Sequence, residues 1–120
     1  VVWKHERGTP YVPSPVLFDG MLFYNQSNQG IWTVLDATSG KIVMDRTRLP
    51  GISNMYSSPV AANGRIYVTG RNGLTLVLKP GTNLSIESSN RLDEQFDASP
   101  SIAGDELYLR GEKFLYCIAK

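Results

Sequence analysis

An eleven-residue pattern that begins with Ser-Pro occurs three times in this chain of 120 residues, and the three copies align without gaps. The prolines of the copies are 44 and 41 residues apart, at Pro15, Pro59 and Pro100. Internal repetition of this length is typical of architectures in which each unit is one small group of strands or helices. β-Branched and aromatic residues fill the repeats and no helical period competes with them, so the sequence predicts an all-β chain.

Short turn signals divide each unit into strands, here named A to D. Strands A and B are joined by Asp19-Gly20, Asn63-Gly64 and Gly104-Asp105, pairs that accept the positive φ of two-residue hairpin turns. Strand B is expected at about 21–25, 65–69 and 106–110, strand C at about 31–35, 74–78 and 114–118, and strand D at about 41–46 and 84–89. Residues 1–4 are interpreted as the D strand of a preceding unit, which gives the order D-A-B-C three times.

Units of this kind predict the blades of a β-propeller, each a four-stranded antiparallel sheet. They cover residues of about 1–35, 36–78 and 79–120 within one partial propeller domain, residues 1–120. Each proline would begin the inner strand of a blade, an edge position that tolerates a residue without an N–H. Because propellers need roughly four to eight blades to close, three units predict part of a larger ring.

Composition excludes several classes of protein. The formal charge is +1, from 12 basic and 11 acidic residues scattered along the chain, so no nucleic-acid-binding surface is expected. No apolar run is long enough to span a membrane. Cys117 is the only cysteine, which excludes an internal disulfide and a cysteine-based zinc site, and its apolar neighbours predict a buried thiol.

Residues 34–44, which connect strand C to strand D of the first full unit, read Val-Leu-Asp-Ala-Thr-Ser-Gly-Lys-Ile-Val-Met. They resemble the signature of the PQQ-like (quinoprotein-dehydrogenase-like) propeller repeat, Ala-x-Asp-x-x-Thr-Gly-Lys-x-x-Trp, with matches at Asp36, Gly40 and Lys41. The resemblance implies that Asp36 and Gly40 shape the turn, and that Trp3, which matches the end of the motif in a preceding unit, docks between blades. It further implies the C-terminal three-blade portion of a larger bacterial propeller protein, periplasmic or secreted.

The resemblance is specific for architecture and not for activity. The repeat occurs in quinone-dependent alcohol dehydrogenases and also in scaffold and secreted proteins without a cofactor. The family's enzymes bind quinone and calcium on a full ring, with a base Asp and often a vicinal cysteine pair, and no motif of this chain matches those groups. We therefore assign no catalytic residue, metal ligand or cofactor, and expect PQQ with calcium only if the chain belongs to such an enzyme.

In a propeller with this strand order, the D-to-A and B-to-C loops lie on one face, around the mouth of the central channel. Binding residues usually lie on loops that a rigid scaffold positions. Such loops here carry arginine, amide, phenol and carboxylate groups, which can bind a carboxylate, a sugar or a peptide. The candidate ligand-binding residues are Arg48, Asn54, Tyr56, Arg71, Asp97 and Arg110. The alternative is an ordinary solvated loop surface.

Two other groups have both a functional and a structural interpretation. His5, the only histidine, could act as a general base beside Glu6, but no nucleophile stands at a recognisable spacing, which favours a surface histidine. Asp93, Glu94 and Asp97 could bind a cation, but calcium loops space their ligands more densely, which favours a solvated acidic loop.

Three functions stay open at this point. The first is a scaffold or binding module that recognises a protein, peptide or glycan. The second is a structural part of a PQQ-dependent dehydrogenase whose cofactor site lies on other blades, and a weaker third is a hydrolase or lyase site at the channel mouth. The expected partners are the remaining blades of a parent chain or a second copy, and no nucleic acid.

Overall fold

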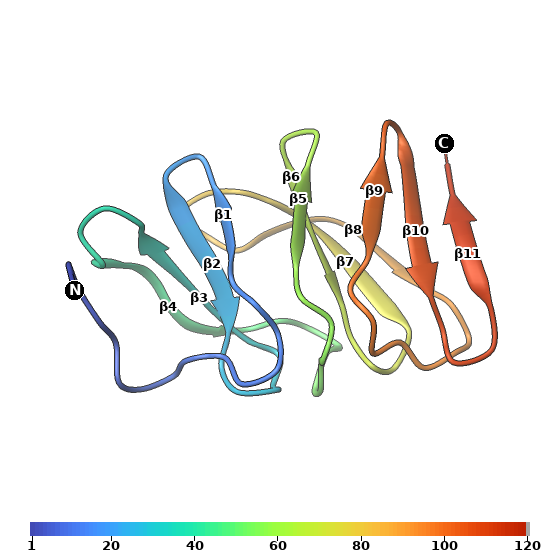
Figure 1. Ribbon diagram of the computed structural model, residues 1–120, viewed down its shortest axis with the longest axis horizontal. Helices are drawn as coiled ribbons and strands as arrows, with labels where there is room; N and C mark the ends of the chain where they lie inside the picture. The colour runs from blue at the N-terminus through green and yellow to red at the C-terminus, as the bar shows by residue number, and fades with distance from the viewer. Residues whose placement is uncertain (120) are drawn as a thin grey trace.

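The computed structural model describes residues 1–119, which form eleven strands and no helix, and therefore no helix long and apolar enough to cross a membrane. The strands make three antiparallel sheets that follow one another from the N-terminal to the C-terminal end of the molecule (Figure 1). Blade 1 contains β1 (Val16–Phe18), β2 (Met21–Asn25), β3 (Ile31–Asp36) and β4 (Ile42–Arg48). Blade 2 contains β5 (Val60–Ala62), β6 (Arg65–Thr69), β7 (Leu74–Lys79) and β8 (Ser85–Arg91). Blade 3 contains β9 (Ser101–Ala103), β10 (Glu106–Arg110) and β11 (Leu115–Ile118).

Each sheet is a meander in which every strand pairs with its neighbours in sequence, so the all-β prediction of antiparallel propeller blades is confirmed. The strands β2, β6 and β10 coincide with the predicted B strands. The D strands β4 and β8 extend two residues beyond the predicted ends, to Arg48 and Arg91. Local turn signals therefore locate the inner strands better than the outer ones, which end in long loops.

The turns from strand A to strand B are the tight hairpins that the sequence predicts. Asp19 and Gly20 have φ of 50° and 72°, and Asn63 and Gly64 have φ of 53° and 72°. Two successive positive φ values are characteristic of a type I′ turn, whose twist matches that of the strands it joins. A Cβ at Gly20 or Gly64 would meet no atom within 4 Å, so these glycines are required by backbone conformation alone.

The prediction of a strand at residues 1–4 is wrong for this structure. These residues form no strand. Among the described residues, the only sheet that lacks a fourth strand is blade 3, and it lies at the opposite end of the molecule from residues 1–4 (Figure 1). Trp3 is still held against blade 1, where its Nε1 donates a 3.0 Å hydrogen bond to the carbonyl of Ala37. The side chain is half-buried against blade 1 alone, whereas the resemblance implied docking between two blades.

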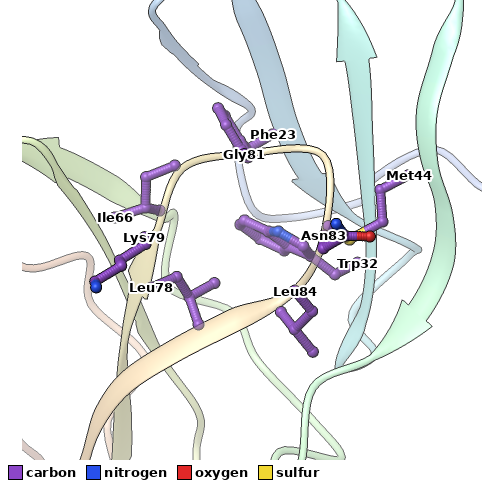
Figure 2. A pocket seen from close by; sticks show the side chains of 9 residues that line it. All are labelled: Phe23, Trp32, Met44, Ile66, Leu78, Lys79, Gly81, Asn83 and Leu84. Carbon is purple, nitrogen blue, oxygen red and sulfur yellow. The ribbon is translucent and has the colours of Figure 1, made fainter.

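The main core lies between blades 1 and 2. Trp32 is 1% exposed, and the residues that face it from blade 2 include Ile66 and Leu78, both almost fully buried. Figure 2 shows the Trp32 indole between Phe23 and Met44 of its own blade and the loop that carries Leu84. The strand faces that meet here are apolar on both sides, so burial of this seam stabilises the pair of blades.

Blade 3 is covered much less well, and the expectation that Cys117 is buried is wrong. Cys117 is exposed on β11, beside Leu115, which is 71% exposed. The reason is that β11 is an edge strand whose outer face meets no other blade in residues 1–119. An apolar stretch predicts a strand correctly, but it does not tell which strand faces are covered.

A hydrogen bond between serines joins each pair of neighbouring blades at the start of strand A. The amide of Ser14 donates to Oγ of Ser58, and the amide of Ser58 donates to Oγ of Ser99, both at 2.8 Å. The donor and acceptor in each bond are the serines that precede the repeated prolines. The Ser-Pro pairs thus set the register between blades as well as the start of the strand, a role not predicted from the sequence.

Candidate functional site

The loops of one face are joined into a continuous layer, here called the loop belt, made of residues 9–12, 26–30, 49–57, 70–73, 92–98 and 111–113. The amide of Arg71 donates to the carbonyl of Asn54 at 2.9 Å, and the carbonyl of Arg71 accepts from the amide of Phe96 at 3.3 Å. The amide of Glu112 donates to the carbonyl of Gln95 at 3.0 Å. Each B-to-C loop is therefore fixed by the D-to-A loops beside it, and the face is ordered by backbone hydrogen bonds.

Glycines allow this close approach. A Cβ at Gly30 would lie 1.9 Å from the carbonyl oxygen of Ile52, and one at Gly73 would lie 2.0 Å from that of Leu92. Both distances are far below van der Waals contact, so a larger residue would push the two loops apart. The belt depends on these two B-to-C glycines for its geometry.

At the centre of the belt, Arg71 lies between an aromatic ring and a carboxylate. Its guanidinium carbon is 4.3 Å from the ring centroid of Tyr56, a cation–π contact. Its Nε and Nη2 donate to the two carboxylate oxygens of Asp97 at 2.6 and 3.1 Å, a bidentate pair. Hydrogen bonding to Asp97 raises the pKa of Arg71. The three side chains come from three different loops, so the fold creates the cluster.

The structure gathers four of the six candidate ligand-binding residues. Asn54, Tyr56, Arg71 and Asp97 meet in this cluster, and Gln95, which was not among the candidates, donates to Asp97 at 3.3 Å. Arg48 and Arg110 are the exposed last residues of β4 and β10, and they make none of the cluster's contacts. Gln95 lies two residues before Asp97, so its loop position was the only sequence signal for it.

In the acidic loop, Asp93 and Asp97 are exposed, as expected of a solvated group, whereas Glu94 is half-buried. The half-buried carboxylate of Glu94 accepts hydrogen bonds from the amides of Lys113 and Phe114 and a 2.5 Å bond from the hydroxyl of Tyr116. Burial raises the pKa of Glu94, but the hydrogen bonds from Tyr116, Lys113 and Phe114 lower it more, so it lies below the ordinary value. Among residues 1–119, no group of three or more His, Cys, Asp or Glu side chains is arranged so that it could bind a metal ion. Glu94 therefore caps the B-to-C turn of blade 3.

His5 is half-buried and lies against the turn that contains Gly40. Its Nε2 lies 2.7 Å from the carbonyl oxygen of Gly40, and its ring packs edge-on against Trp3 at 5.7 Å. Gly40 has φ of 74°, and a Cβ there would lie 2.6 Å from the Trp3 ring. In the same turn, the Asp36 carboxylate accepts from the amide and hydroxyl of Ser39 at 2.8 and 3.0 Å. His5 thus fastens the N-terminal segment to this turn.

Comparison with known proteins gives matches of structure and not of sequence, since no family model and no curated protein matches the chain. BamB from Moraxella catarrhalis superposes on 98% of this chain with a TM-score of 0.75 and 19% identity. The quinohemoprotein alcohol dehydrogenase ADHIIG from Pseudomonas putida HK5 superposes on 98% with a TM-score of 0.69 and 11% identity. The chain spans only 36% and 20% of those two proteins. At such low identity these likenesses show the fold alone, and they identify the three sheets as blades of a β-propeller.

Proposed function

We propose that the chain is part of a non-catalytic propeller scaffold that binds a protein, peptide or glycan at the loop belt. The arrangement of Tyr56, Arg71 and Asp97 carries the proposal. An arginine held by a bidentate carboxylate and an aromatic face is already ordered before any ligand arrives, which lowers the entropic cost of binding. Further partners would be additional blades, from a longer chain or a second copy, and the place of action would be the periplasm or the cell exterior.

The charge of the cluster favours a neutral ligand. Asp97 neutralises Arg71, so a free anion gains little net attraction there. Within the described part of the chain, Nη1 of Arg71 and the side-chain amide of Asn54 make no hydrogen bond. These donors suit backbone carbonyls or sugar hydroxyls, and the Tyr56 ring offers a flat apolar surface beside them. A peptide segment of a protein fits this set best.

The test is binding selection with a matched control variant. The chain would be panned against displayed peptides and a glycan array, and the selected ligands measured on Arg71→Ala and Tyr56→Ala. Arg65→Ala is the control, because Arg65 makes a similar bidentate pair with Glu87, but between β6 and β8 and away from the belt. We expect roughly tenfold or greater loss of affinity for the belt variants and none for the control. Equal binding by Arg71→Ala and Arg65→Ala would refute the site.

The likeness to a quinohemoprotein alcohol dehydrogenase supports a second candidate, a structural part of a quinoprotein enzyme. In that case the cofactor would lie on blades outside this chain, since no residue of the loop belt matches the family's quinone or calcium ligands. Adding PQQ and calcium to a complete propeller that contains this chain discriminates between the two candidates. A rise in melting temperature, or a change in quinone absorbance, would contradict the pure scaffold.

A further inference from the structure

The chain contains two Asn-Gly dipeptides, Asn63-Gly64 and Asn72-Gly73, and the fold holds them in opposite ways. An asparagine that precedes glycine can deamidate, because a residue without a Cβ leaves its amide nitrogen free to approach the asparagine side chain. We propose that Asn63 is a site of spontaneous deamidation in the folded protein, and that the fold protects Asn72 from the same reaction. This inference does not depend on what the loop belt binds.

The reaction at Asn63 consumes one water molecule and releases one ammonia molecule. The deprotonated backbone nitrogen of Gly64 attacks Cγ of Asn63 and forms a C–N bond. The bond from Cγ to Nδ2 breaks, and this nitrogen takes up the lost proton and leaves as ammonia, which gives a five-membered succinimide. Water then adds its hydroxyl to one of the two carbonyl carbons and returns its proton to the Gly64 nitrogen. Opening at Cγ gives aspartate, and opening at the main-chain carbonyl gives isoaspartate.

The Asn63-Gly64 turn leaves both reacting groups accessible. The two residues are exposed at the tip of the hairpin between β5 and β6, and a Cβ at Gly64 would meet no atom within 4 Å. In the described part of the chain, the amide of Gly64 makes no hydrogen bond. The Asn63 side chain is held only by a long contact of 3.5 Å from its Nδ2 to the carbonyl of Gly104. Local opening of such a tip costs little free energy, so the geometry for attack is accessible.

Asn72-Gly73 is held at both reacting groups. The attacking nitrogen, that of Gly73, donates a 3.2 Å hydrogen bond to the carbonyl of Gly70. The Asn72 side chain donates from Nδ2 to the carbonyl of Gly51 at 2.7 Å and accepts at Oδ1 from the amide of Leu74 at 3.3 Å. Gly73 is also buried, and the neighbouring loop leaves no room for it to rotate. Because these hydrogen bonds must break before attack, the reaction at Asn72 should be slower by about tenfold or more.

The two products differ in their effect on blade 2. Aspartate at position 63 would recreate the turn of blade 1, because Asp19-Gly20 has φ of 50° and 72° and Asn63-Gly64 has φ of 53° and 72°. Isoaspartate adds a methylene group to the main chain, so a two-residue turn could not keep the pairing of Ala62 with Arg65. Both products remove the amide that reaches Gly104 in the corresponding turn of blade 3.

The positions of the two dipeptides in the blade give the protection its consequence. The A-to-B turns lie at the end of the blades opposite the loop belt, so a new charge at Asn63 is remote from the belt (Figure 1). Asn72 lies in the belt, directly after Arg71. A carboxylate at position 72 would add negative charge beside the pair of Arg71 and Asp97. The fold therefore exposes the dipeptide that is far from the candidate site and protects the one that is next to it.

Peptide mapping of a complete propeller that contains this chain measures both sites in one sample. The folded protein is incubated in mildly alkaline buffer and digested, and mass spectrometry reads the replacement of an amino group by a hydroxyl group at each asparagine. We expect deamidation at Asn63 to be faster than at Asn72 by about tenfold or more. An isoaspartate-specific methyltransferase should label the peptide that contains Asn63 and not the one that contains Asn72.

The same protein unfolded in urea is the matched control, because it keeps both dipeptides and removes the fold. There the two rates should agree within about threefold, since no fixed contact then distinguishes the sites. Asn63→Asp should abolish the fast reaction and leave the melting temperature almost unchanged, whereas Asn72→Asp should lower it, because a carboxylate would then face the carbonyl of Gly51. Equal rates in the folded protein, or a faster reaction at Asn72, would overturn the proposal. A difference that persists in urea would also overturn it, because neighbouring residues and not the fold would then set the rates.

Discussion

A comparison of alanine substitutions at Gly40 and Gly64 measures how strongly the N-terminal segment stabilises the chain. Their φ values, 74° and 72°, are nearly identical, so an added Cβ strains the backbone equally at both positions. At Gly64 the Cβ meets nothing within 4 Å, whereas at Gly40 it would lie 2.6 Å from the ring of Trp3. Gly64→Ala should therefore cost only the left-handed conformation, about 1–2 kcal/mol. Gly40→Ala should cost this and also the docking of Trp3.

The size of the docking term follows from the burial of Trp3. Truncation of a fully buried Trp to Ala costs about 3–5 kcal/mol, and a half-buried ring should cost about 2–3 kcal/mol, including the hydrogen bond to Ala37. Gly40→Ala should then destabilise the chain by about 3–5 kcal/mol, as the sum of both terms.

A double-mutant cycle measured by urea unfolding isolates this contact. In the Trp3→Ala background no ring opposes the new Cβ, so Gly40→Ala should cost no more than Gly64→Ala does. We expect a coupling energy of about 2 kcal/mol between positions 3 and 40, well above the roughly 0.5 kcal/mol limit for independent sites. Additive costs within that limit would show that Trp3 does not dock on Gly40 in solution.

Three further predictions follow from the turns, the blade 3 cap and a buried amide. Gly64→Val should cost about 1–2 kcal/mol by urea unfolding, because a β-branched residue resists positive φ; no cost would argue against the hairpin. The lowered pKa of Glu94 means that its contribution is full above the unfolded glutamate value and is lost as pH falls through the folded value. Wild type should therefore lose more stability on acidification than Glu94→Gln, and parallel pH profiles would contradict the cap. Asn25→Leu should cost about 1–3 kcal/mol, because the fully buried Asn25 amide donates to the carbonyls of Ser27 and Gln29, and thermal unfolding measures it.

The inner part of the fold could be predicted from the sequence because its signals are local. Pairs such as Asn63-Gly64 fix a turn by their own φ preference, and the strands on either side follow from alternation. The strand at residues 1–4 and the burial of Cys117 could not be predicted this way. Both depend on which sheet packs beside these residues, and a local sequence pattern carries no information about that neighbouring sheet.

The candidate site shows the same division. The sequence places Tyr56, Arg71 and Asp97 on the right loops, because loop position follows from the strand order. It could not show that Arg71 is paired with Asp97 rather than free, nor that Glu94 is used to cap a turn. Arg71 and Asp97 are 26 residues apart, and the partners of Glu94 are 19 to 22 residues away from it. Their meeting depends on how the loops cross at glycines such as Gly73.

The contacts between blades, more than the blades themselves, explain how this molecule works as a unit. A four-stranded sheet such as blade 2 has two apolar faces and cannot bury either one alone, so each seam must be formed by two blades. The serine hydrogen bonds align the seams at the channel, and the loop belt fastens the same blades at one face. The seam between blades 1 and 2 contains Trp32 and Ile66 and is well buried, whereas within residues 1–119 blade 3 is covered on one side only. The loop that leads into blade 3 carries Asp97, so the binding cluster includes a side chain from the least supported part of the fold.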